Sequence, residues 1–363
     1  MVVNSYRDLA LWPCDRAARL TDQFQALATK DVIRWTWAPS PATVALNYFA
    51  NGLDDVLASR SEWDYVPCDD AIDWSAIDVL ILTAHGSDMA ARIMEYRRRN
   101  PRMIVALWLW DNHLAHMNNL KTVMAGDLYF PSHRYDSGYL NNLTSPSGMH
   151  VPLCCAQWTE AEARGLLTEL SGVNRSNQLL LNYVDYKFSW RSELLARLRA
   201  ELPQAQALLM PSGDRGRYFD KSSRERMAEW LAHKCTLILP VQQDLSTRIF
   251  DALLAGQVII VPRMVADFDE VIPADLQQAL GVVRIDDFEL STVRAAVDQA
   301  VTTFDAMGAE GVRFRSEYVL NGHMMGHRLL SMLSAIRTAG EGHLTVRLTE
   351  GEGMPLGQRF VKT

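Results

Sequence analysis

The chain has 363 residues, of which 48% are hydrophobic and 22% are charged, an ordinary balance for a globular protein with a sizeable core. This length suggests about two domains. The formal net charge of −7 and the absence of a basic stripe argue against a nucleic-acid-binding protein, and they favour a small molecule or a glycan as the partner.

The cysteines and the short apolar runs indicate a cytoplasmic protein. The five cysteines include no Cys-x-x-Cys pattern, which disfavours a disulfide framework or a zinc site and fits a reducing compartment. Residues 1–15 carry charges inside each short apolar run, unlike a signal peptide. The sequence contains no run of about 18 uninterrupted apolar residues, so no transmembrane helix is predicted.

Strand-like and helix-like segments alternate along residues 30–153. The predicted strands are 32–37, 78–83, 103–110, 127–130 and 149–153. The segments between them with helical character are 44–58, 88–99, 114–125 and 135–142. Strand, helix and strand in this order predict a parallel sheet with helices on both faces.

A second series of the same kind follows a polar, helix-prone connector at 159–178. Its predicted strands are 179–184, 205–210, 236–241, 258–261 and 282–285, and its predicted helices are 190–201, 222–233, 247–254 and 290–307. We therefore predict an α/β protein with two Rossmann-like, doubly wound domains. The predicted parts are a first domain at 1–158, the connector, a second domain at 179–315, a long helix at 316–338 that crosses back, and a tail at 339–363.

Ligands of open α/β sheets bind outside the carboxyl ends of the strands, so we expect the functional loops of both domains to face a cleft. The most informative loop follows the strand at 236–241, where Ser246 or Thr247 caps the next helix and makes a ready anion site. Arg248 in its first turn can hold a phosphate with two hydrogen bonds, or it pairs with Asp244 or Asp251 on the surface. Asp251 either accepts a hydrogen bond from a ribose hydroxyl or is a solvated helix residue.

The segment 246–256 resembles the donor-binding segment of GT-B glycosyltransferases, above all the CgeB-like group, and the fucosyltransferase segment Thr-Glu-Lys-Ile-Phe-Asp-Ala-Leu. The Lys of that segment, matched here by Arg248, contacts the donor diphosphate. Thr247 replaces its Glu, and Gln243 replaces the first acid of the Glu-x7-Glu signature that many retaining members carry. The resemblance covers about residues 75–335. It implies the GT-B fold and a metal-independent glycosyltransferase whose substrate is a nucleotide sugar, with no further cofactor.

Two other loops of the second domain supply candidate donor contacts. Asn182 and Lys187 follow the strand at 179–184, and this loop lies near the donor phosphates in GT-B proteins. Arg215 and Arg217 flank a glycine after the strand at 205–210, an arrangement that suits a base, ribose or phosphate contact. In both loops the alternative is ordinary solvated charge.

The first domain is expected to bind the acceptor. Asp111 and His113 follow the strand at 103–110, where either can act as the general base that takes the acceptor proton, or they are a helix cap and a surface histidine. His85 and Asp88 either contact the acceptor or form a strand-to-helix turn with a cap. Trp110 is the tryptophan that we expect to stack on a sugar, the alternative being core packing.

The sequence thus predicts transfer of a sugar from a nucleotide-activated donor to a glycan or lipid-linked glycan. Contact with a membrane surface stays open, because many glycan acceptors sit on lipid carriers. Three other functions also stay open: a non-catalytic nucleotide- or glycan-binding module with this fold, a nucleotide-sugar epimerase, and a two-lobed protein that binds a small ligand.

Overall fold

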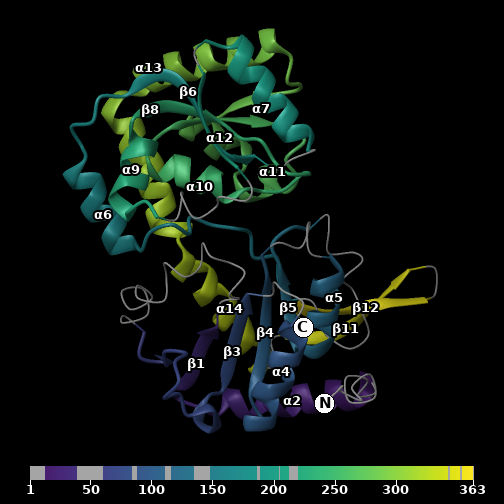
Figure 1. Cartoon of the computed structure of the whole chain (residues 1–363). Coiled ribbons are helices and arrows are strands. Elements are labelled where there is room, and N and C mark those ends of the chain that lie inside the picture. The colour runs from purple at the N-terminus through teal and green to yellow at the C-terminus, as the bar shows by residue number, and fades with distance from the viewer. Residues whose placement is uncertain are drawn as a thin grey trace. The chain divides into compact units, whose positions relative to one another are not determined.

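The computed structural model divides the chain into two compact units (Figure 1). Unit 1 comprises Met1–Pro152 and Gly326–Thr363, and unit 2 comprises Leu153–Met325. The structure describes residues 13–38, 60–83, 88–110, 116–134, 148–185, 189–203, 205–211, 220–341, 344–351 and 354–362. The chain therefore leaves unit 1 once, builds unit 2, and returns to unit 1 near its end.

Unit 1 contains a five-stranded parallel sheet in the order β2-β1-β3-β4-β5. Its strands are β1 (Ile33–Ala38), β2 (Trp63–Tyr65), β3 (Val79–Thr83), β4 (Ile104–Leu109) and β5 (Leu128–Pro131). Its helices are α2 (Pro13–Ala28), α4 (Met89–Arg99), α5 (His116–Ala125) and α14 (Met325–Gly340), with the 3-10 helix η2 (Trp74–Ala76). A two-stranded antiparallel hairpin, β11 (Leu344–Gly351) and β12 (Met354–Lys362), follows α14.

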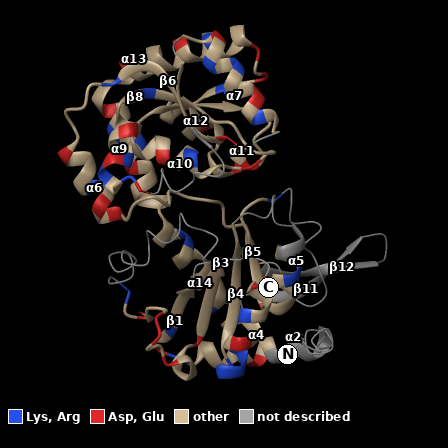
Figure 2. Ribbon diagram, viewed as in Figure 1, with Lys and Arg blue, Asp and Glu red and all other residues tan. Residues whose placement is uncertain are grey.

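The central strands of unit 1 form because their side chains are apolar on both faces. Every residue of β3 and β4 is buried, and neither strand carries a charged residue (Figure 2). Helix α4 packs on one face of the sheet, with Ile93 in the same apolar cluster as Leu80 and Val105. This continuous apolar pattern is typical of parallel strands that are covered on both sides.

Unit 2 contains a second five-stranded parallel sheet in the order β10-β9-β8-β6-β7. Its strands are β6 (Ser176–Asp185), β7 (Ala205–Pro211), β8 (His233–Leu237), β9 (Val258–Pro262) and β10 (Val283–Ile285). Its helices are α6 (Glu160–Glu169), α7 (Trp190–Glu201), α9 (Ser223–Leu231), α10 (Thr247–Leu254), α11 (Phe268–Val271), α12 (Ala274–Leu280) and α13 (Leu290–Gly322).

Alternation along β6 sends its side chains to two separate cores. Leu179 and Leu181 pack with α7 and the first half of α13, whereas Leu180 packs with α9 and α10. Helices therefore cover both faces of this sheet as well, and the prediction of two doubly wound α/β units is correct.

The structure corrects several element boundaries. Residues 149–153 form no strand: Val151 donates its backbone N–H to Pro131, but Pro152 has no N–H with which to continue a ladder. The strand β2 was not predicted. The helix expected at 316–338 is divided between α13 and α14, and a kink lies instead at Gly308, whose φ of 55° is left-handed. The predicted helices at 44–58 and 135–142 lie outside the described residues.

Among the described residues, no helix combines the length and the apolar character that crossing a membrane requires.

Candidate functional site

Strand order places a candidate site at the carboxyl edge of the sheet in unit 2. Strand β6 lies between β7, which follows it in sequence, and β8, which comes after β7. The chain thus winds in opposite directions on the two sides of the β6–β8 pair. In such sheets a crevice opens at this switch point, outside the carboxyl ends of the two strands.

The loop after β8 is held by its own polar side chains. Asp244 is buried, and its carboxylate accepts the backbone N–H of Val241. Ser246 is the N-cap of α10, and its hydroxyl accepts the backbone N–H of Arg248 at 3.3 Å. These contacts fix the turn that directs the amino end of α10 towards the switch point, where its first N–H groups favour an anion.

The rest of the 246–256 segment is a packing element. Every residue in it is buried except Thr247 and Arg248. Residues such as Ile249, Phe250 and Leu253 belong to the apolar cluster between α10 and the sheet. Thr247 and Arg248 are therefore the two side chains of this segment that a ligand can reach.

Arg248 is held in place by the end of β6. Its Nε donates to the backbone carbonyl of Asn182 at 3.1 Å, and its guanidinium carbon lies 4.5 Å from the centre of the Tyr183 ring. Its Nη1 and Nη2 donate to no residue that the structure describes, and it forms no ion pair within the described ranges. The predicted alternative, a surface pair with Asp244 or Asp251, is wrong, because Arg248 forms an ion pair with neither of these described residues and both carboxylates are buried. The outer edge of the guanidinium group thus remains available to a ligand.

Tyr183 is itself fixed by two hydrogen bonds across the switch point. Its hydroxyl donates to the carbonyl of Leu237 at 2.7 Å and accepts the N–H of Leu239 at 2.9 Å. The guanidinium carbon of the buried Arg191 also lies near this ring, 5.3 Å from the centre of the Tyr183 ring. Burial raises the pKa of the Tyr183 phenol, while the charges of Arg248 and Arg191 act in the opposite direction. Tyr183 was not predicted from the sequence, although an aromatic residue at the end of a buried strand was a signal for it.

Asn182 supports Arg248 through its backbone and not through its amide group. Its side chain is 2% exposed, and its Nδ2 donates to Glu229 at 3.0 Å. Glu229 also binds Lys221, so α9 is tied to the same strand end. A direct contact between the Asn182 amide and a ligand is therefore not the role that this geometry favours.

Asp251 points into the protein interior. Its side chain is 1% exposed, and its Oδ2 accepts a hydrogen bond from Gln157 at 2.7 Å. Burial raises its pKa to about 6, although hydrogen bonds from Gln157 and Cys155 and the charge of Arg248 act to lower it. The prediction of a solvated helix residue is wrong, and contact with a ribose would first require this carboxyl group to leave its buried partners.

An aromatic pair lies beside the loop that follows β8. Trp190, the first residue of α7, donates its indole N–H to the carbonyl of Val241 at 2.9 Å and is 37% exposed. Its ring contacts Phe288, with the ring centres 5.5 Å apart. The carboxyl edge therefore offers an apolar surface next to the anion site.

The remaining predicted donor residues, Lys187, Arg215 and Arg217, lie outside the described residues. In unit 1, Asp111, His113 and His85 also lie outside them. Asp88 precedes α4 and pairs with Arg92 at 2.8 Å. Trp110 is 5% exposed and packs edge-on against Trp108, with ring centres 4.8 Å apart, so its ring is covered. The part of the chain that the structure describes holds no group of three His, Cys, Asp or Glu side chains placed to bind a metal ion.

Comparison with known proteins supports the fold. No family model matches the chain, and no curated protein matches it. A solved O-GlcNAc transferase from Thermobaculum terrenum aligns over 86% of this chain and 69% of its own, at 14% identity and a TM-score of 0.51. A UDP-forming α,α-trehalose-phosphate synthase from Burkholderia vietnamiensis aligns over 73% of this chain and 72% of its own, at 11% identity and a TM-score of 0.48. A putative UDP-N-acetylglucosamine 2-epimerase from Listeria monocytogenes aligns over 86% of this chain and 98% of its own, at 10% identity and a TM-score of 0.42. The likeness to the first structure agrees with the GT-B-type α/β architecture predicted from the sequence, and at this identity it shows the fold alone.

Proposed function

We propose that this chain is a glycosyltransferase that transfers a sugar from a nucleotide-activated donor to a hydroxyl group of a glycan or lipid-linked glycan. One observation carries the proposal. Within the segment that resembles the GT-B donor motif, the side chains of Thr247 and Arg248 reach the surface. Asn182 and Tyr183 hold Arg248 in place, and the outer edge of its guanidinium group pairs with none of the described residues. Such a group suits the bidentate recognition of a phosphate.

In the proposed reaction, the bond between the anomeric carbon and the terminal phosphate oxygen of the donor breaks. Negative charge then develops on the departing nucleoside diphosphate. Helix α10 begins with Ser246 as its N-cap and Thr247 as its first residue. The first N–H groups of this helix and Arg248 stabilise that charge without needing to move, because core packing already holds the helix. This step requires no metal ion, in keeping with the resemblance.

The other predicted residues have supporting roles in the proposal. Arg215, Arg217 and Lys187 add positive charge around the donor. Asp111 or His113 removes the proton from the acceptor hydroxyl as it attacks the anomeric carbon, which is the work of a general base. Asp251 acts indirectly, because its buried carboxyl group lies beneath Arg248 on the same helix.

A thermal-shift screen against UDP, GDP, CMP, ADP and dTDP tests donor binding. A ligand at about 100 times its Kd stabilises the fold by about 2.7 kcal/mol, which is a visible shift. We expect one nucleotide to stand out for the wild-type chain and to lose its effect in Arg248→Ala. If none of the five shifts the wild type, the proposed donor class is wrong.

Product analysis then separates the proposed transferase from its rivals. With the matching nucleotide sugar, a transferase releases the nucleoside diphosphate faster when an acceptor is present. A binding module leaves the donor intact, and an epimerase changes the sugar while it is still joined to the nucleotide. Either of these results would overturn the assignment of glycosyl transfer while leaving nucleotide binding in place.

A further inference from the structure

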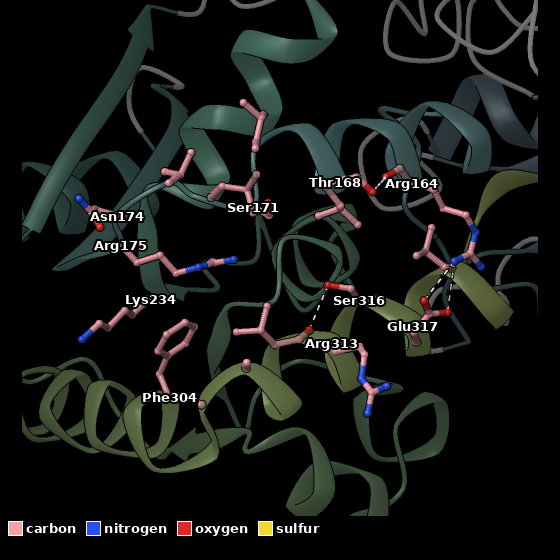
Figure 3. Close-up of a pocket in the computed structure, with 18 of the residues that line it drawn as sticks. Arg164, Thr168, Ser171, Asn174, Arg175, Lys234, Phe304, Arg313, Ser316 and Glu317 are labelled. Atoms are coloured by element: carbon pink, nitrogen blue, oxygen red, sulfur yellow. Dashed lines mark hydrogen bonds and ion pairs between the residues drawn. The ribbon is translucent and has the colours of Figure 1, made fainter.

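A concave site lies at the opposite edge of the sheet in unit 2. A cavity of about 800 Å³ lies between the end of α6, the starts of β6 and β8, and the middle of α13 (Figure 3). Its walls include Ser171 and Arg175 before β6, Lys234 in β8, and Phe304 and Arg313 in α13. We call this cavity the amino-edge pocket. Its size suits a small organic ligand.

The amino-edge pocket is separate from the donor crevice. Arg175 precedes β6, whereas Asn182, which holds Arg248, lies near the carboxyl end of that strand. The two residues are seven positions apart (175 to 182) on extended chain, or about 23 Å. A ligand of the crevice and a ligand of the pocket can therefore be told apart by mutation.

A kink in α13 shapes the pocket wall. Gly308, which lines the pocket, has a φ of 55° inside the helix, in the left-handed region that favours glycine. A Cβ atom added there would meet no atom within 4 Å, so the space beside it is open. The two halves of α13 on either side of this residue supply Phe304 and Val312 to the same cavity.

The lining of the pocket is positively charged in a protein of net negative charge. Four cationic side chains line it, and two carboxylates oppose them: Arg164, Arg175, Lys234 and Arg313 against Asp305 and Glu317. Asp305 pairs with Lys234 at 2.7 Å, and Glu317 pairs with Arg164 at 3.1 Å. Figure 3 shows Arg175, Lys234 and Phe304 on one side of the pocket and Arg164 with Glu317 on the other. Arg175 and Arg313 are left without an ion pair to any described residue.

Arg175 is the least compensated of these charges. Among the described residues, its guanidinium group donates hydrogen bonds to two backbone carbonyls, those of His233 at 3.2 Å and Ala255 at 2.7 Å. Burial lowers the pKa of Arg175 to about 10, and no carboxylate acts to raise it, yet the group remains charged at neutral pH. Two carbonyls leave part of the five-donor fork unused.

A second guanidinium group, which is fully buried, increases this excess of positive charge. Arg315 is fully buried, and its Nη2 has no hydrogen-bond partner among the described residues. Its guanidinium carbon lies 5.5 Å from the Phe304 ring centre, against 5.3 Å for Arg175 and 5.9 Å for the Lys234 ammonium. Three cations thus surround one ring.

Capping explains only part of this arrangement. Arg175 and Arg315 hold the carbonyls of Ala255 and Gly256 at the end of α10, where a helix dipole favours positive charge. That dipole is equivalent to about half an elementary charge, so it does not balance two guanidinium groups, of which Arg175 is half-buried and Arg315 is buried. An anion in the cavity next to Arg175 would supply the missing charge.

We propose that the amino-edge pocket is a second ligand site, which binds a small phosphate monoester with an apolar or ring-shaped organic part. Lys234 and Arg164 are neutralised by their carboxylate partners, and the two remaining lining cations, Arg175 and Arg313, together match the charge of such a phosphate group. Arg175 holds the phosphate, and Phe304 with Leu167 and Val312 contacts the organic part.

The experiment is a calorimetric titration of the full chain with phenyl phosphate, with phenol as the neutral control. The wild type is expected to bind phenyl phosphate and not phenol. Arg175→Gln is expected to weaken binding at least about tenfold, whereas Arg248→Ala, which changes only the donor crevice, stays within about twofold. The proposal is overturned if the wild type does not bind, or if binding is lost in Arg248→Ala and retained in Arg175→Gln.

A second pair of variants avoids the structural role of Arg175. Asn174 is exposed and lines the pocket, so its substitution disturbs no buried partner. Asn174→Glu adds a negative charge at the rim and is expected to weaken phenyl phosphate binding about tenfold, while Asn174→Gln is expected to leave it unchanged. Equal affinities in the two variants would overturn the proposal even if Arg175→Gln failed to fold. Neither titration depends on glycosyl transfer.

Discussion

Arg248→Ala removes a guanidinium group that Asn182 and Tyr183 hold at the carboxyl end of β6. In the proposed complex this group donates two charge-assisted hydrogen bonds to a phosphate of the donor. Each such bond contributes about 1.5–3 kcal/mol when measured alone, and the pair shares one phosphate. We therefore expect a total loss of about 3 kcal/mol, which raises the Kd of the nucleoside diphosphate by about two orders of magnitude.

The same substitution has a small effect on folding. It removes one hydrogen bond to a backbone carbonyl and one contact with an aromatic ring, together about 1–2 kcal/mol of stability. Arg248 is half-buried, so no large cavity forms. The variant should therefore fold, and its affinity for the nucleotide can be measured directly by calorimetry.

Two further variants complete this experiment. Arg248→Lys keeps the positive charge but loses the fork and the bond to Asn182, so we expect a loss of about tenfold. Arg199→Ala removes an exposed arginine from the last turn of α7, at the other edge of the sheet, and is expected to leave the Kd unchanged. If folded Arg248→Ala binds the nucleotide within about twofold of the wild type, the donor site has been placed wrongly.

Three further predictions concern Tyr183 and Asp251, which lie next to Arg248, and Gly256, which follows the carboxyl end of α10. Tyr183→Leu removes the ring under Arg248 and should weaken nucleotide binding about tenfold, whereas Tyr183→Phe keeps the ring and should stay within about threefold; calorimetry on both variants decides this. Burial raises the pKa of Asp251 from 3.8 to about 6, so the folded chain binds this proton more tightly than the unfolded chain does. The contribution of this group to the stability of the fold therefore falls as the pH rises from about 4 to about 6. Asp251→Asn should therefore gain up to about 3 kcal/mol relative to the wild type at about pH 7.5 and less at about pH 4.5; an equal difference in urea unfolding at both pH values would contradict this. Gly256 has a φ of 72°, and an added Cβ atom would lie 2.6 Å from Cγ1 of Val312. Gly256→Ala should therefore lower the free energy of unfolding by at least about 2 kcal/mol. The control Gly172→Ala should leave it unchanged, because Gly172 is exposed and an added Cβ atom there meets no atom within 4 Å.

The sheets could be predicted from the sequence because their strands are apolar without interruption. The predicted segments 78–83 and 103–110 correspond to β3 (Val79–Thr83) and β4 (Ile104–Leu109). The short β2 could not be found in this way, because its three residues, Trp63–Tyr65, gain their strand conformation from pairing with β1 and carry no apolar run of their own. Local pattern predicts what a segment buries, but not what its neighbours impose on it.

The candidate site was predicted less completely, for a similar reason. The caps and the position of Arg248 follow from local sequence, since a helix that begins after a polar loop has its first turn at the strand end. Whether a side chain on that helix faces the crevice or the core depends on how the helix lies on the sheet. Asp251, three residues after Arg248, falls on the core side, and only the packing of α10 against Gln157 and the sheet reveals this.

The packing of α10 also bears on how the proposed site would work. The helix is held at both ends: Ser246 caps its amino end, and Arg175 and Arg315 bind the carbonyls of Ala255 and Gly256 after its carboxyl end. Between these points its side chains are buried from Ile249 onwards. Arg248 therefore stands on an element that cannot shift without disturbing the core. A cationic group fixed in this way needs no reorganisation when charge develops on a leaving phosphate, and this is the condition under which electrostatic stabilisation contributes most to catalysis.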